Sequence, residues 1–152
     1  MSELPLKPEQ QEPTNLVWRH EQKFWISLYQ YHRLRSAFRS VLYIDKYCYE
    51  RGDYNIRSLY FDSHQGEAAF DKLSGLSTRR KFRMRIYNRS SDRIVMEIKN
   101  RFQDRISKQS SSLNLEQALE LIEGELPPVK DNDNVLMQFY HEMNQKLIKP
   151  TI

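Results

Sequence analysis

The sequence predicts an α+β fold, a β-sheet flanked by helices. Several segments alternate apolar and polar residues with the period of a strand, most clearly residues 79–87. Other segments repeat apolar residues at helical spacing and begin at capping residues such as Ser27 and Asn114. The 152 residues give room for one domain with one core.

The elements follow in order along the chain. Strands are expected, from alternation and turn residues, at residues 18–26, 54–61, 79–87, 93–100 and 105–113. Helices are expected after the caps and apolar repeats, at residues 28–42, 62–73, 115–122 and 135–147. A polar turn is expected at residues 88–92.

Composition indicates a folded domain, with 29% charged and 39% hydrophobic residues. Residues 1–16 are rich in Pro and Glu and are predicted to be a disordered lead-in to a domain at 17–152. Cys48 is the single cysteine, so no intrachain disulfide can form. The longest apolar run, residues 41–44, is too short for a membrane span. We therefore expect a cytoplasmic protein.

Positive charge is concentrated in one segment of the chain. Residues 79–108 contain eleven Lys/Arg against three Asp/Glu, whereas residues 109–152 contain three against seven. Such asymmetry indicates an anionic partner.

The strand at residues 79–87 has one cationic face. Lys81, Arg83 and Arg85 alternate with apolar residues, so they project from one side about 7 Å apart. Neighbouring charges repel by roughly 2 kcal/mol at an effective dielectric near 20. A row of like charges makes sense where a polyanion lies along it.

Other strands repeat this pattern, with Lys23 near Glu21, Lys99 near Glu97, and Lys108 alone. If the faces converge, they form a concave surface lined by Lys23, Lys81, Arg83, Arg85, Lys99 and Lys108. Carboxylates among so many cations stay ionised, which makes Glu21 and Glu97 candidate ligands for Mn²⁺ or Mg²⁺. The alternative is that each charged face is simply solvated and each Glu-x-Lys pair is a weak surface ion pair. Because basic residues share one face on each of four strands, the anion-site interpretation is favoured.

Five motifs then occur in register, namely Arg19-x-Glu21-x-Lys23, residues 56–62, residues 71–75, residues 79–87, and Glu97-Ile98-Lys99. Together they resemble the VTC-type (vacuolar transporter chaperone-type) polyphosphate polymerase domain of the triphosphate tunnel metalloenzymes. The resemblance implies an antiparallel β-tunnel with a basic lumen. In that family, ATP and inorganic polyphosphate bind with Mn²⁺ or Mg²⁺, and the γ-phosphate passes to a growing polyphosphate chain.

Carried over by motif, Arg83, Arg85 and Lys99 become the catalytic candidates. The phosphate-binding set is Lys23, Arg57, Lys81, Arg83, Arg85, Lys99 and Lys108, with Arg57 at the lumen or its rim. The family tunnel needs more strands than this sequence predicts, so we expect half a triphosphate-tunnel barrel. A C-terminal half outside this sequence or association of two copies as a homodimer would complete it.

The sequence leaves the enzymatic question open. An active domain would be a metal-dependent phosphotransferase, whereas a truncated or sensor domain would bind polyphosphate or nucleotide without transfer. Nucleic-acid binding is disfavoured, because base stacking needs aromatic side chains on the cationic face and Phe82 lies on the opposite one. Tyr87 is the main exception.

Overall fold

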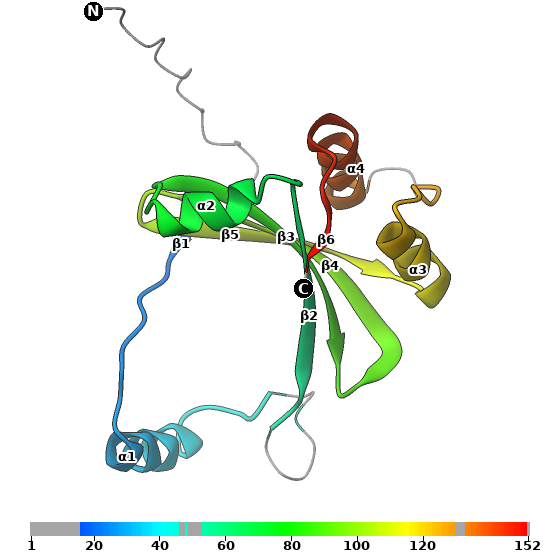
Figure 1. The fold of residues 1–152 in the computed structure, drawn as a ribbon. Coiled ribbons are helices and arrows are strands. Elements are labelled where there is room, and N and C mark those ends of the chain that lie inside the picture. The colour runs from blue at the N-terminus through cyan, green and yellow to red at the C-terminus, as the bar shows by residue number, and fades with distance from the viewer. Residues whose placement is uncertain (1–15, 46–47, 49–52, 130–132, 152) are drawn as a thin grey trace, which may run out of the picture.

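The structure is a computed structural model that describes residues 16–45, 48, 53–129 and 133–151. The predicted lead-in at residues 1–16 therefore lies, apart from Leu16, outside the described residues. The fold is α+β, with one six-stranded antiparallel sheet and four helices (Figure 1). None of the helices in the described ranges is long and apolar enough to span a bilayer.

The strand order across the sheet is β1-β5-β4-β3-β2-β6, and the sheet does not close on itself. The strands are β1 (Arg19–His20), β2 (Ile56–Asp62), β3 (Thr78–Tyr87), β4 (Ser90–Phe102), β5 (Arg105–Leu113) and β6 (Lys149–Thr151). Strands β3, β4 and β5 are consecutive hairpin partners and form the long centre of the sheet.

The turn between β3 and β4 is tighter than the predicted turn at residues 88–92. Asn88 and Arg89 have φ values of 53° and 59°, the left-handed conformation of a two-residue hairpin turn. The register shifts between Ile86 and Tyr87, so Tyr87 pairs with Ser90. This irregularity lets β4 begin at Ser90, three residues before the predicted start.

Two of the four helices begin directly after the capping residues that predict them, Ser27 and Asn114. The helices are α1 (Leu28–Arg39), α2 (Glu67–Leu73), α3 (Leu115–Glu123) and α4 (Asn134–Lys146). Ser27 and Asn114 form capping boxes with Gln30 and Gln117, respectively. Helix α2 begins later than predicted, but the Asp62 carboxylate still accepts hydrogen bonds from its first-turn backbone amides.

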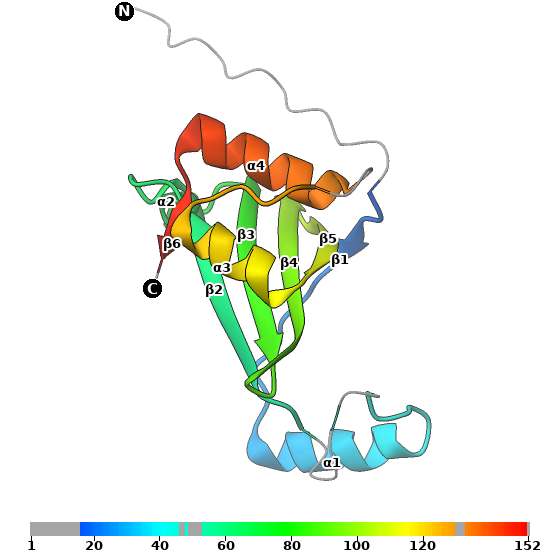
Figure 2. The ribbon, with the colours of Figure 1, turned by 90° about the vertical axis from the view of Figure 1, so that its right-hand side faces the viewer.

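One face of the sheet packs against α3 and α4, which lie side by side over β3 and β4 (Figure 2). The core between them contains Phe82, Met84, Met96 and Ile98 from the sheet. Phe139 of α4 is completely buried and packs edge-on to Phe61, with ring centroids 4.9 Å apart. The alternation of β3 and β4 therefore leaves their other face for polar groups.

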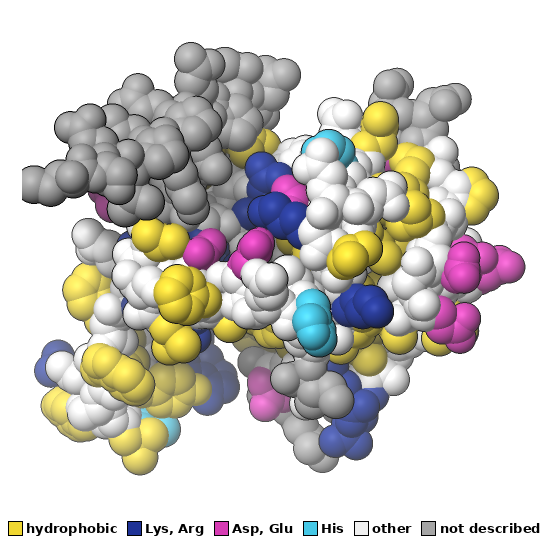
Figure 3. Space-filling model, turned by 45° about the horizontal axis from the view of Figure 1, so that its top comes forward, with side chains coloured by type: hydrophobic (Ala, Val, Ile, Leu, Met, Phe, Trp, Pro, Cys, Tyr) yellow, Lys and Arg dark blue, Asp and Glu magenta, His cyan; other side chains and the backbone are white. Residues whose placement is uncertain are grey.

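Helix α1 lies away from this core. Its apolar residues recur at helical spacing, as predicted, but none of them is buried. Leu34 is 41% exposed and Phe38 is 51% exposed. Figure 1 shows α1 apart from the sheet, at the lower left, and Figure 3 shows hydrophobic side chains gathered in the same part of the molecule.

The two edge strands differ most from the prediction. The strand expected at residues 18–26 is reduced to the two residues of β1, and an irregular segment follows as far as α1. Strand β6 was not predicted. It pairs Pro150 with Phe61 of β2, a position that proline tolerates because β6 is an edge strand.

Candidate functional site

The site is built on the sheet face opposite α3 and α4. On β3, Phe82 and Met84 are buried in the core, so the alternating Lys81, Arg83 and Arg85 project to the other face. All three are partly buried rather than fully solvated. The sequence predicted this division of β3.

The register places the cations of different strands side by side. Lys81 pairs with Lys99, and Lys99 pairs with Lys108, so three lysines lie abreast on β3, β4 and β5. Adjacent strands are about 4.8 Å apart, so this row spans about 10 Å. The structure thus brings together three residues that are spread over 27 positions of the sequence, from Lys81 to Lys108.

Glu97 lies in the next row, directly opposite Arg83. The Glu97 side chain is only 2% exposed, and its Oε2 accepts a 2.7 Å hydrogen bond from Arg83 Nε. Arg85 Nη1 lies 3.6 Å from the same oxygen, and Lys108 Nζ lies 3.5 Å from Oε1. One carboxylate is therefore shared by three cations.

These contacts determine the charge states of Glu97 and Arg83. Burial alone would raise the pKa of the Glu97 carboxyl, but the Arg83 hydrogen bond and the surrounding charges hold it below its ordinary value. Burial opposes the charge of Arg83, yet its bonds to Glu97 and Tyr60 raise its pKa above the ordinary value. Both groups are therefore charged near neutral pH.

Glu21 forms the second acidic contact of this face. Both of its oxygens lie 3.0 Å from Lys99 Nζ, across 78 positions of sequence. The Lys99 hydrogen bond is the main reason that the Glu21 carboxyl has a lowered pKa. Lys23 follows in the irregular segment, is exposed, and contributes charge to the same carboxyl.

Lys81 differs from its two neighbours in the row, because it forms no ion pair within the described residues. Burial lowers the pKa of Lys81, and the nearby charges of Lys72 and Arg79 lower it further. An anion placed against Lys81 would favour its charged form and so oppose both effects.

Arg57 lies on the other side of the sheet. It pairs with Ile86, which packs against the core, so Arg57 is on the helix-facing side and exposed. The structure does not bring it together with the other predicted phosphate ligands.

Two polar residues of β2, which the sequence did not predict as site residues, also belong to this site. Tyr60 pairs with Arg83 and bonds to it, which lowers the pKa of the Tyr60 hydroxyl. Ser58 accepts a 3.3 Å hydrogen bond from Arg85 Nε. Their even spacing on β2 was the available signal, but it identifies partners only once the β2–β3 register is known.

The carboxylates of this face do not fit a metal ion as they stand. Both oxygens of Glu97 face cations, and both oxygens of Glu21 contact Lys99. Across the described part of the chain, no group of three or more His, Cys, Asp or Glu side chains could hold a metal. The use of Mn²⁺ or Mg²⁺ stays a prediction, which these donors do not support.

Comparison with known proteins gives one family. The family model described as the VTC domain matches residues 18–152. A search of the curated proteins finds no match to this chain.

Proposed function

The chain belongs to the VTC domain family, and from this premise we propose that it is a polyphosphate polymerase-type domain. In this proposal, ATP and inorganic polyphosphate bind along the polar face of the sheet, and a phosphoryl group passes to the polyphosphate chain. The family match supports a polyphosphate-related function, and the arrangement of cations supports its location on this face.

The observation that carries the proposal is the lysine row of Lys81, Lys99 and Lys108 beside Arg83 and Arg85. Five cations on adjacent strands share one face, while the described carboxylates in contact with them are Glu97 and Glu21. A face built only for solvation would mix the two signs. Excess positive charge favours a phosphate chain.

The arginines are suited to bind phosphate oxygens in a fixed geometry. Arg83 uses Nε for Glu97, so its terminal nitrogens supply the bond to Tyr60 and still have N–H groups left as donors. Guanidinium groups bind phosphate through paired hydrogen bonds, and lysines act as mobile point charges. We therefore assign Glu97 as a positioning residue that holds Arg83 and Arg85, in place of its predicted role as a metal ligand.

Phosphoryl transfer demands mainly alignment and charge neutralisation from a protein. Arg83 and Arg85 would align the triphosphate, and Lys99 would neutralise charge that develops during transfer. A closed tunnel would enclose these groups more fully than the open sheet, with additional strands from further chain or from a second copy.

The test is polyphosphate formation from ATP in buffers containing Mn²⁺ or Mg²⁺. The unaltered protein should form polyphosphate, and Arg83→Gln or Arg85→Gln should reduce the rate by about a hundredfold, as expected for lost transition-state charge contacts. Arg89→Gln, on the β3–β4 turn, is the matched control and should retain full activity. Absence of product from the unaltered protein would reject transfer.

The open sheet favours a second candidate function, which is binding without transfer. A domain of this kind would act as a polyphosphate or nucleotide sensor. Binding of tripolyphosphate that does not depend on metal, with no product formed from ATP, would select this alternative.

A further inference from the structure

We propose that Arg79 and Arg101, with Arg19 beside them, form an extension of the phosphate site that selects long phosphate chains over triphosphate. This inference rests on the proposed function, because it takes the polar face as the binding surface. It adds a substrate-length preference and residues that the motifs did not assign.

The arginines form a row next to the lysine row. Arg79 precedes Lys81 by two positions and pairs with Arg101, which follows Lys99 by two. Across the sheet, Arg101 and Arg19 are both paired with Ile106 of β5. Directly paired residues project to the same face, so the arginine row continues the lysine row toward the β4–β5 hairpin.

The charges of this row are less neutralised than those at the centre of the site. Arg79 Nη1 donates to the Leu76 carbonyl at 2.9 Å, and Arg101 Nε donates to the Gln103 carbonyl at 2.8 Å. Neither guanidinium forms an ion pair with another residue that the structure describes. By contrast, Lys99 and Lys108 each contact a carboxylate.

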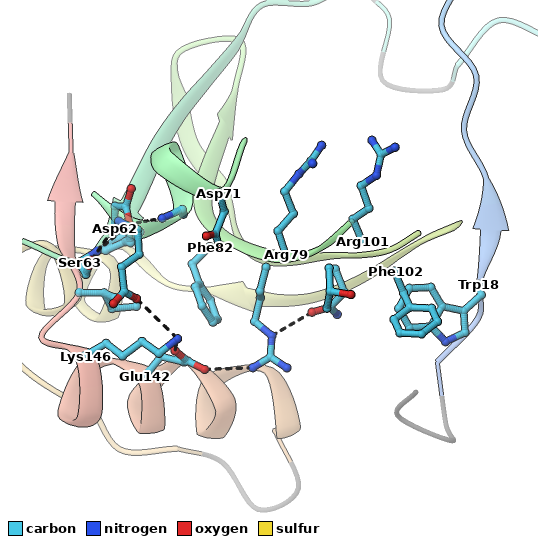
Figure 4. A pocket seen from close by; sticks show the side chains of 17 residues that line it. Trp18, Asp62, Ser63, Asp71, Arg79, Phe82, Arg101, Phe102, Glu142 and Lys146 are labelled. Atoms are coloured by element: carbon cyan, nitrogen blue, oxygen red, sulfur yellow. Dashed lines mark hydrogen bonds and ion pairs between the residues drawn. The ribbon is translucent and has the colours of Figure 1, made fainter. Parts of the chain in front are cut away.

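The two arginines also border a cavity of about 500 Å³ at this end of the sheet, between α2 and α4, which is lined as well by Arg80 and Glu142 of the helix-facing side. Figure 4 shows Arg79 and Arg101 extending side by side away from α4, with Glu142 and Lys146 on α4 itself. Figure 3 shows a hollow where basic and acidic side chains gather.

Most of the acidic groups of this cavity are already engaged. Glu142 contacts Arg80 at 3.1 Å and Lys146 at 3.4 Å, both on the helix side of the sheet. The Asp62 carboxylate accepts hydrogen bonds from amides at the start of α2. Glu67 contacts Lys146 at 3.8 Å, so Asp71 is the lining carboxylate that has no side-chain partner among the described residues.

A triphosphate held by Arg83, Arg85 and Lys99 would end near the lysine row. Arg79 and Arg101 lie two residues further along their strands. A longer chain would continue about 7 Å further along the strands and reach them. The arginines should therefore add affinity only for ligands longer than the central site, and add little for triphosphate.

The experiment compares tripolyphosphate with long-chain inorganic polyphosphate by isothermal titration calorimetry. The double variant with Arg79→Gln and Arg101→Gln should weaken long-chain binding by about tenfold, since each exposed ion contact contributes at most about fivefold. Tripolyphosphate affinity should stay within twofold. The slope of log K against log salt for the long chain should fall by about one unit per arginine removed. Arg89→Gln is the control, because it removes one arginine from the β3–β4 turn, beyond the opposite end of β3.

The outcomes separate this inference from the proposed function. If Lys81→Gln weakens both ligands while the double arginine variant spares both, the central site stands and the extension is rejected. Equal weakening of both ligands by the double variant also rejects it, because the arginines would then act by general charge. Failure of the unaltered protein to bind either ligand would reject the extension together with the proposed function. Asp71→Asn provides an independent check and should tighten long-chain binding.

Discussion

Arg83 and Glu97 face each other across β3 and β4 and share a 2.7 Å hydrogen bond on a carboxylate side chain that is 2% exposed. A charge this deeply buried is tolerated because three cations surround it. The pair therefore links the stability of the sheet to the arrangement of the proposed phosphate ligands.

Replacement of Arg83 by Met should destabilise the protein by roughly 2–3 kcal/mol, because Glu97 would lose its closest partner while it remains buried. Urea unfolding followed by circular dichroism measures the change. The exposed Arg89→Gln should shift the free energy of unfolding by less than about 0.5 kcal/mol. Equal effects of the two variants would contradict the role given to Glu97.

Acid should destabilise the protein through Glu97. Its folded pKa lies below the ordinary value of 4.5, so the unfolded chain takes up a proton first as the pH falls. The stabilisation is complete above about pH 4.5 and is lost as the pH falls through the folded pKa. Thermal unfolding across this range should show a shallower dependence for Glu97→Gln. Glu21 has a lowered pKa of the same sign and would account for the part that remains.

Lys81→Met should stabilise the ligand-free protein by up to about 1 kcal/mol, because it removes a half-buried cation that other cations repel. The same change should reduce the stabilisation by tripolyphosphate, which reaches about 2.7 kcal/mol at a hundredfold excess over Kd. Thermal unfolding with and without ligand measures both effects. Lys149→Met, an exposed change on β6, should leave the ligand effect intact. A destabilised Lys81→Met protein would argue that Lys81 has a structural partner.

Leu34→Glu on α1 should leave the free energy of unfolding within about 0.5 kcal/mol, since Leu34 is 41% exposed and touches no core residue. The change should also reduce self-association, because large exposed apolar patches promote it. Sedimentation velocity and urea unfolding test the two effects. Leu121→Ala, at a position with no exposure, should instead cost about 2–5 kcal/mol. A large loss of stability from Leu34→Glu would place α1 in the folding core.

The sequence predicted the central elements well because their signals are local. The alternation in β3 indicates its two faces, and Asn114 indicates the start of α3 through its capping box. Strand β5 matches its predicted range of 105–113. The α+β class and the VTC-type resemblance are both confirmed.

The remaining features depend on register and on packing at a distance. No local signal shows that Tyr60 meets Arg83, or that Arg79 meets Arg101, because those pairs follow from strand alignment. Strand β6 is too short to produce an alternating pattern. The apolar repeat of α1 predicted the helix, but periodicity does not reveal whether its apolar face is covered.

Pro150 has a consequence for how the sheet meets other chains. It lies in the outermost strand on the β2 side and has no backbone amide hydrogen to donate to an incoming strand. On the opposite border, β1 pairs with only Arg105 and Ile106 of β5. Fibrillar stacking requires long, regular borders as templates, so the margin formed by β6 should seed such growth poorly.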